Sequence, residues 1–148
     1  MPCTVYELGA LKDYKYVVVL SVYNNMLMLS KHNFRTSWET QGGHIEPGET
    51  PLQAAKRELY EESGAIDFTI EPIFDYRSGD EISYADGVVF LAKIKKLGVI
   101  PADSEMRDVG FFEFLPKSLT YPKIIPVLFK RAKDMGLIDY EEKYTFKK

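Results

Sequence analysis

Several features that mark other classes of protein are missing from this sequence. It has a single cysteine, Cys3, among 148 residues, which excludes an intrachain disulfide and a cysteine-based metal cluster. Its longest strongly apolar run, Val17 to Leu20, is far too short to cross a bilayer. The N-terminus lacks the charged-then-apolar pattern of a secretory signal. We therefore expect a cytoplasmic protein that has no membrane partner.

The sequence also lacks an excess of positive charge. It contains 19 lysines and arginines against 22 acidic residues, for a net charge of −3. Non-specific nucleic-acid binders usually carry a basic surplus, so the charge disfavours a nucleic-acid partner. Hydrophobic residues make up 45% and charged residues 28%, which is typical of a folded soluble domain. We expect a single domain over residues 1–148, as a monomer or a homodimer.

The N-terminal third shows the pattern of short β-strands. Tyr16 to Tyr23 is rich in valine and aromatic residues and predicts a strand. Asn24-Asn25 predicts a tight turn, because asparagine tolerates positive φ, and Met26 to Ser30 is expected to return as a hairpin. The expected features that follow are a polar loop at 31–37 and a short strand at 38–41, ended by Gly42-Gly43.

The clearest helix signal comes next. Thr50 is a good N-cap, and Gln53 three residues later completes a capping box. Pro51 occupies the first helical position, where its missing N–H is not needed. The sequence then favours helix as far as Ser63, and Gly64 is placed to end it.

The C-terminal half combines further strands with a second helix. The expected strands are Phe68 to Tyr76 and Val88 to Ile94, around a turn at 78–80, and Val109 to Phe114. Apolar residues at helical spacing from Ile125 to Met135 predict a helix, with Pro126 in its first turn and Gly136 at its end. Strands interleaved with two helices predict a mixed α/β (α+β) sandwich.

Three glutamates on the first helix indicate a metal site. Glu58, Glu61 and Glu62 have the spacing i, i+3 and i+4, so they share one helix face and repel one another by about 0.2–0.5 kcal/mol per pair. Oxygen ligands without cysteine or paired histidine suit Mg²⁺ or Mn²⁺. The carbonyl of Gly43 can approach such an ion because glycine has no side chain. The unremarkable alternative is a solvated helix face.

Residues 43–65 resemble the Nudix box. Gly43 is followed after five residues by Glu49, and after seven more by the run Arg57 to Ala65, which reads RELYEESGA. Seven polar or glycine positions match the family pattern, which chance would give in roughly one chain per million. Ala65 departs from the aliphatic residue of the family, which affects packing rather than chemistry. Gln41 stands where many relatives have proline before the glycine pair.

The resemblance implies a Nudix-type α/β/α sandwich with a mixed central sheet and the box helix packed against it. It implies metal-dependent hydrolysis of a nucleoside diphosphate linked to another group, with Mg²⁺ or Mn²⁺ and more than one ion when substrate is bound. Glu58 by its position is also a candidate to orient or deprotonate the water. The implied metal ligands are Gly43, Glu58, Glu61 and Glu62; Glu58, Glu61 and Arg57 are implied to be catalytic, and Glu49 to support Arg57.

Outside the box the candidates are less specific. Family members often add a metal ligand or base from the loop before the last core strand, where Glu105 lies, with Asp103 and Asp108 as competitors. Any of these can equally be an exposed loop acid. The candidates for substrate binding are Arg35 for phosphate, Trp38 for base stacking and His44 after the glycine pair. The alternatives are a solvated Arg35, a core Trp38 and an exposed His44.

The small size is similar to MutT-type enzymes, which convert nucleoside triphosphates, including oxidised dGTP, to monophosphate and pyrophosphate. Glu81 stands where ADP-ribose hydrolases tend to have proline, whereas Tyr84 lies near the tyrosine position of dinucleoside polyphosphate hydrolases. An RNA 5′-end pyrophosphohydrolase and a catalytically silent nucleotide sensor remain alternatives. Isopentenyl diphosphate isomerases share the fold but need a catalytic cysteine near the glycine pair, which Cys3 is not placed to supply.

Overall fold

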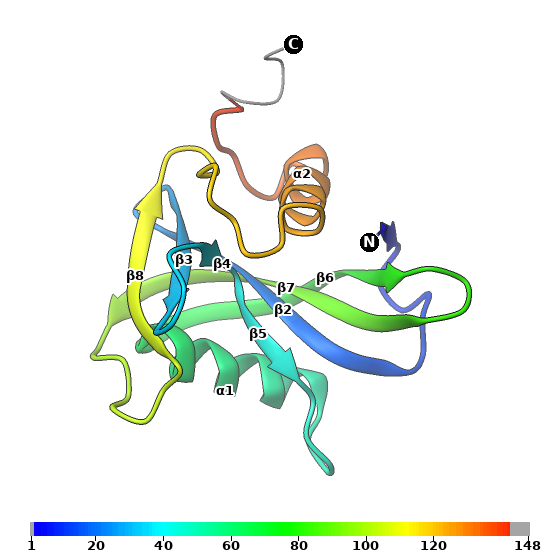
Figure 1. The fold of residues 1–148 in the computed structure, drawn as a ribbon, viewed down its shortest axis with the longest axis horizontal. Coiled ribbons are helices and arrows are strands. Elements are labelled where there is room, and N and C mark those ends of the chain that lie inside the picture. Colours follow the sequence, from blue (N-terminus) through cyan, green and yellow to red (C-terminus); the bar gives the residue numbers. More distant parts are fainter. Residues whose placement is uncertain (1, 143–148) are drawn as a thin grey trace.

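The computed structural model describes residues 2–142; Met1 and residues 143–148, which the expected domain also includes, lie outside the described residues. The described part of the chain forms strands and two helices, shown in Figure 1. In chain order they are β1 (Cys3–Tyr6), β2 (Tyr14–Tyr23), β3 (Met26–His32), β4 (Trp38–Glu39), β5 (Gln41–His44), α1 (Pro51–Ser63), β6 (Ala65–Gly79), β7 (Tyr84–Leu97), β8 (Met106–Phe112) and α2 (Ile125–Asp134).

The strands form one mixed sheet. Its main order is β1-β6-β7-β2-β3-β4, while β5 pairs with β2 and β8 pairs with β3. The pairing of β2 with β7 is parallel, and the others are antiparallel. Helix α1 lies on one face of this sheet and α2 on the other (Figure 1). This arrangement confirms the expected α/β/α sandwich with a mixed central sheet.

Two apolar cores lie on opposite faces of the sheet, because successive strand residues point to opposite faces. The core against α1 includes Val17, Val19 and Leu59. The core against α2 includes Leu20, Leu29 and Phe129. The box helix is therefore fixed by its buried side, and its charged side remains available.

Two different strands, β3 and β5, pair with the same edge of β2. Strand β7 pairs with β2 from Tyr14 to Val22, so β3 and β5 must share the opposite edge. Strand β5 pairs with residues 16–19 of β2, and β3 pairs with residues 21–23. We call the place where β3 and β5 separate, next to residues 19–21, the β2 fork.

Several expected boundaries are wrong. Gly42 and Gly43 do not end a strand, because they lie inside β5. The strand is interrupted earlier, at Thr40, where the chain passes from pairing with β3 to pairing with β2. Strand β3 continues to His32 because β8 pairs with it there. Strand β8 begins at Met106 and ends at Phe112. Strands β6 and β7 extend beyond their apolar runs because they pair with each other, and β1 was not expected at all.

Candidate active site

The box helix begins and ends where the sequence predicts. The Thr50 hydroxyl accepts a hydrogen bond from the Gln53 N–H at 3.1 Å, and the Gln53 side chain accepts one from the Thr50 N–H at 2.9 Å. Pro51 is the first helical residue. Gly64 has φ of +80° and donates its N–H to the Tyr60 carbonyl, which is the usual glycine termination. These contacts define the first and last turns of the helix.

Arg57 connects the helix to the segment that precedes it. Its guanidinium donates two hydrogen bonds to Glu49, at 2.7 and 2.9 Å, and one to the His44 carbonyl at 3.1 Å. It also lies 3.3 Å from a carboxylate oxygen of Glu61. Arg57 therefore contacts both the Glu49 and the Glu61 carboxylates. Hydrogen bonds from Arg57 lower the pKa of Glu49 to about 2, so Glu49 stays ionised beside it.

Glu58 lies directly against Gly43. A Cβ atom on Gly43 would be 1.8 Å from a carboxylate oxygen of Glu58, so only glycine leaves room for this carboxylate beside the β5 backbone. Glu58 is half-buried, and burial raises its pKa to about 7, with the neighbouring Glu61 adding to the increase and Arg57 opposing it. The Gly43 backbone and the Glu58 carboxylate thus meet at one point.

Glu62 is held on the other glycine of the pair. Its carboxylate accepts a hydrogen bond from the Gly42 N–H at 2.8 Å. Burial raises the pKa of Glu62 to about 9, and the negative charges of Glu58, Glu39 and Glu105 add to the increase. These acids come from α1, β4 and the segment before β8, so the tertiary structure gathers negative charge around Glu62.

The donor set suits a hard divalent cation. Within residues 2–142, no three acidic, histidine or cysteine side chains are already arranged around a common metal position. Glu58 and Glu62 are nevertheless half-buried carboxyls on one helix face, and their raised pKa values show that a nearby positive charge would stabilise them. Oxygen donors of this kind, with the Gly43 carbonyl, fit Mg²⁺ or Mn²⁺. Such an ion lowers the pKa of a bound water and neutralises phosphate oxygens.

Of the three loop acids considered, Glu105 is the one whose charge acts on the cluster. It is exposed and immediately precedes β8, and its carbonyl accepts a hydrogen bond from the Asn33 N–H at 2.8 Å. Its carboxylate contributes to the raised pKa of Glu62. Asp108 instead accepts a hydrogen bond from the next residue's N–H, and Asp103 is exposed on the preceding turn.

The candidate substrate-binding residues lie in different settings. Arg35 is exposed, and its guanidinium lies 3.5 Å from a carboxylate oxygen of Glu39. Its pKa is raised, chiefly by a hydrogen bond with Tyr121. Trp38 is partly buried against the α2-side core and packs edge-on against Phe112, with ring centroids 5.1 Å apart.

His44 is exposed and its ring lies 4.5 Å from that of Tyr16. Trp38, by contrast, has the packing of a core residue because it lies against Phe112. Arg35 and His44 carry groups that remain accessible to a phosphate.

Glu39 and Thr120 belong to this region but do not stand out in the sequence. Glu39 is only 9% exposed, and its carboxylate accepts a hydrogen bond from the Thr120 hydroxyl at 2.8 Å. Thr120 in turn lies 2.7 Å from the Ser37 hydroxyl. The local sequence offers one signal, an acidic residue inside a predicted strand. Thr120 is 81 residues away from Glu39 along the chain, so the sequence does not show that the two side chains meet.

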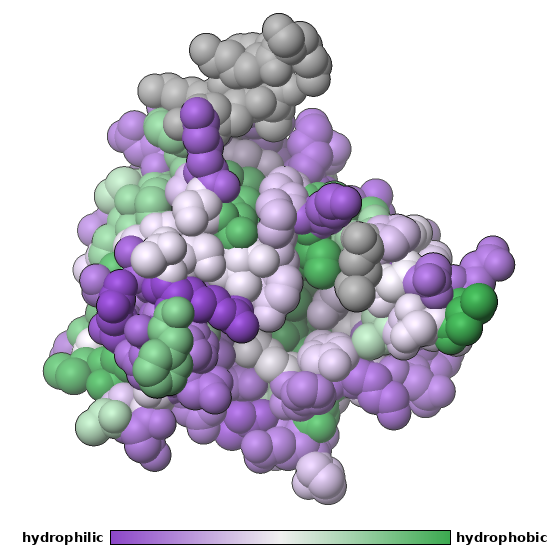
Figure 2. All heavy atoms as spheres, in the orientation of Figure 1, coloured by the Kyte–Doolittle hydropathy of each residue, from purple (hydrophilic) through white to green (hydrophobic). Residues whose placement is uncertain are grey.

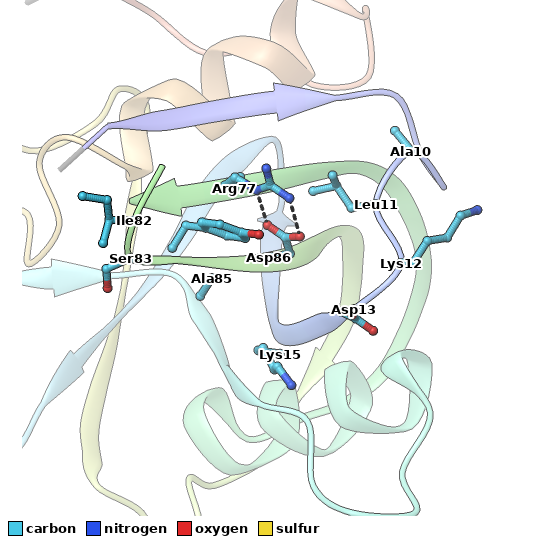
Figure 3. A pocket seen from close by; sticks show the side chains of 11 residues that line it. Ala10, Leu11, Lys12, Asp13, Lys15, Arg77, Ile82, Ser83, Ala85 and Asp86 are labelled. Atoms are coloured by element: carbon cyan, nitrogen blue, oxygen red, sulfur yellow. Dashed lines mark hydrogen bonds and ion pairs between the residues drawn. The ribbon is translucent and has the colours of Figure 1, made fainter. Parts of the chain in front are cut away.

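A surface pocket of about 720 Å³ lies between the 10–15 loop and the β6–β7 hairpin (Figure 3). Arg77 forms paired hydrogen bonds with Asp86 at 2.6 and 2.9 Å, and its guanidinium lies 4.0 Å from the centre of the Tyr84 ring. None of the candidate site residues lines this pocket. Tyr84 is therefore engaged away from the carboxylate cluster.

Comparison with known proteins identifies the family. The NUDIX domain profile matches residues 14–122, which is most of the chain, and the chain belongs to the Nudix family of hydrolases. Nudix hydrolases are generally dependent on divalent metals. The part of the chain that the structure describes contains no helix long and apolar enough to span a membrane. Figure 2 shows a face on which hydrophilic side chains surround small hydrophobic patches.

A curated relative and a solved structure, both from Bacillus subtilis, resemble the chain over most of its length. YtkD, which carries the provisional name 8-oxo-dGTP diphosphatase, is 27% identical over 134 residues, 84% of each chain. The crystal structure of the pyrophosphohydrolase BsRppH, a single-substitution variant, superposes with a TM-score of 0.75, at 27% identity and 93% coverage of each chain.

An RNA pyrophosphohydrolase of Francisella tularensis is 37% identical over 73 residues, 49% of this chain and 46% of its own length. The chain thus spans about half the length of that relative.

Proposed function

We propose that this enzyme hydrolyses nucleoside triphosphates, including oxidised dGTP, to the nucleoside monophosphate and pyrophosphate with Mg²⁺ or Mn²⁺. The observation that carries the proposal is the pair of half-buried carboxyls, Glu58 and Glu62, held against Gly43 and Gly42. In the reaction, the oxygen of water bonds to phosphorus and one bridging P–O bond breaks. The water proton passes to a carboxylate and then to solvent.

The chain's residues divide this work. Glu58, Glu61, Glu62 and the Gly43 carbonyl hold the cation, and Arg57 acts by fixing Glu61 and, through Glu49, the segment that leads into the helix. Arg35 and His44 are exposed and so are accessible to phosphate oxygens. Glu105 is the candidate for accepting the proton of the attacking water, since its charge already acts on Glu62.

The choice of substrate rests on YtkD, a relative whose sequence match covers most of this chain and most of its own length. YtkD carries the name of a diphosphatase for an oxidised nucleoside triphosphate. A second candidate is the 5′-triphosphate end of RNA, supported by the Francisella tularensis match and by the likeness to BsRppH. The net charge of −3 favours the free nucleotide, because RNA binding depends on cationic contacts with phosphates.

Product analysis with a substrate panel tests this proposal. The panel contains dGTP, 8-oxo-dGTP, diadenosine tetraphosphate and a 5′-triphosphorylated RNA oligonucleotide, each with Mg²⁺, with Mn²⁺ and with EDTA. We expect monophosphate and pyrophosphate from a free triphosphate with the highest kcat/KM, and no turnover in EDTA. A higher kcat/KM on the RNA end would favour the second candidate, and turnover in EDTA would overturn the metal-dependent reaction.

The glutamate face is tested by the double variant Glu61→Gln/Glu62→Gln. We expect kcat to fall by orders of magnitude while the circular dichroism spectrum is unchanged. The substitutions remove two negative charges that bind the cation, but they keep the size and packing of the side chains. The matched control Glu71→Gln/Glu81→Gln neutralises two exposed acids of β6 and the hairpin and should keep wild-type activity. A folded Glu61→Gln/Glu62→Gln protein with full activity would contradict the assignment.

A further inference from the structure

A buried polar side chain fills the β2 fork. Gln41 is the first residue of β5 and pairs with Val19, which is next to the point where β3 and β5 separate. Gln41 is fully buried, as are Ser21 of β2 and Ser30 of β3. Buried polar groups are found where they have hydrogen-bond partners, and here each of the three does.

The three side chains form a directional chain of hydrogen bonds. The Ser21 hydroxyl donates to the Gln41 carbonyl oxygen Oε1 at 2.7 Å. The Gln41 amide nitrogen donates to the Ser30 hydroxyl at 2.8 Å and to the Met28 carbonyl at 3.4 Å. The amide thereby connects all three strands that meet at the fork, and an apolar residue of the same size would connect none of them.

This chain ends at Glu62. The Ser30 hydroxyl donates to the main-chain carbonyl of Glu62 at 2.8 Å, one of the last carbonyls of α1, which lack a partner within the helix. The residue after Gln41 supplies the N–H that the Glu62 carboxylate accepts, at 2.8 Å. The backbone and the carboxylate of Glu62 are therefore both held by groups whose positions depend on Gln41.

We propose that Gln41 is a positioning residue that sets the Glu62 carboxylate for the divalent cation. The inference rests on the proposed function, because it assigns Gln41 a role toward the metal site of that function. Replacing a satisfied buried polar group by an apolar one of similar shape can leave stability nearly unchanged. What the amide supplies is a unique placement of the fork, and through it of the end of α1.

The experiment compares Mn²⁺ affinity with folding. The variants are Gln41→Met, which keeps the volume and removes the amide, Ser30→Ala, which breaks the link to Glu62, and the double variant. Free Mn²⁺ is measured by electron paramagnetic resonance without substrate, and melting curves are recorded without metal. We expect each single variant to weaken Mn²⁺ binding at least fivefold, and the double variant to weaken it no more than the stronger single one.

Steady-state kinetics add a second measurement. At saturating Mn²⁺, we expect kcat to fall while the KM for nucleotide changes less than twofold, because Gln41, Ser21 and Ser30 are fully buried. The control Tyr14→Phe removes the hydroxyl that donates to the Asp75 carboxylate in β6, on the β7 side of β2 and away from the fork. It should lower the melting temperature and leave Mn²⁺ affinity unchanged.

The outcomes separate the two proposals. A wild-type protein that binds no Mn²⁺ would overturn the proposed function itself. A wild-type protein that binds Mn²⁺, together with a folded Gln41→Met variant that binds it within twofold, would overturn the positioning role alone. If Gln41→Met does not fold, Ser21→Ala removes only the donor to Gln41 Oε1, and the same affinity comparison applies.

Discussion

Gly42 and Gly43 are adjacent in β5, but a methyl group at each position would meet a different obstacle. At Gly42 it would lie 2.3 Å from the carbonyl oxygen of Val17, and φ there is +151°. At Gly43 it would meet the end of the Glu58 side chain at 1.8 Å. A backbone atom of a paired strand cannot move aside, whereas a carboxylate on a flexible side chain can.

We therefore expect one alanine substitution to lower stability and the other to lower activity. Gly42→Ala should destabilise the fold by about 1–3 kcal/mol or more, because it combines backbone strain with a main-chain clash. Gly43→Ala should change the melting temperature little but lower kcat at least 100-fold, since it displaces Glu58. Thermal melts and steady-state kinetics on both proteins check this. An active, folded Gly43→Ala enzyme would show that the contact with Glu58 has no catalytic importance.

Glu105 is the loop acid whose role can be tested most directly. Proton transfer by a positioned side chain contributes about 10²–10⁴ to rate, so Glu105→Gln should lower kcat at least tenfold with a smaller effect on KM. Asp103→Asn and Asp108→Asn serve as matched controls and should stay close to wild type. Equal behaviour of the three variants would contradict a catalytic role for Glu105.

At the scale of an element, α1 is specified at both ends and along its length by nearby residues. Its cap, its first proline and its terminal glycine all lie within a turn of the helix ends. Arg57 then joins the helix to Glu49 just before it. This pair fixes the entrance of the helix, and its electrostatic contribution depends on pH.

The sign of that dependence follows from the low pKa of Glu49. Folding lowers this pKa from 4.5 to about 2, so between these values the unfolded chain binds a proton that the native state does not. The stabilisation is present above about pH 4.5 and is lost as the pH falls toward 2. Glu49→Gln should thus lower the melting temperature by a few degrees at pH 7, with the difference from wild type shrinking as pH falls from 5 to 2.

The control for this prediction is Glu46→Gln. Glu46 lies 3.8 Å from Arg57 and its side chain is 62% exposed, and exposed pairs contribute little. Its melting temperature should follow that of wild type at every pH. A difference between Glu49→Gln and wild type that is the same at pH 7 and pH 3 would exclude the ion pair as its cause.

The same contrast between local and distant determinants explains the errors in strand boundaries. Helix α1 was predicted to the residue because its signals are local. The glycine pair was expected to end a strand, but β2 supplies hydrogen-bond partners along residues 41–44. Strand β1 was missed because it depends on pairing with residues 75–78 of β6. A strand is stabilised by its partner, and the local sequence does not identify that partner.

At the scale of the whole molecule, the sheet buries apolar side chains on both faces and leaves an acidic cluster at one side of α1. Unfolding disperses the ligands of a divalent cation, so an ion that binds the native state adds to its stability by mass action. At a concentration about 100 times its dissociation constant, this stabilisation is about 2.7 kcal/mol.

Melting curves in Mg²⁺ and in EDTA should consequently differ. For a protein of this size we expect a melting temperature about 5–10 °C higher with saturating cation. The Glu61→Gln/Glu62→Gln protein should show a much smaller shift, because its site has lost two charges. Identical curves for the wild type in the two conditions would argue against cation binding by the glutamate face of the native state.

The sequence by itself determined the box helix, its glutamate face and the mixed α/β class, because these depend on spacings of a few residues. The tertiary structure decided which other groups reach that face. Glu39 and Glu105 come from separate segments to act on Glu62, Thr120 donates a hydrogen bond to Glu39, and Gln41 bonds with Ser21 and Ser30 from two other strands. These contacts exist because strand pairing and burial on both faces of the sheet bring distant segments together, and no local pattern encodes such distances.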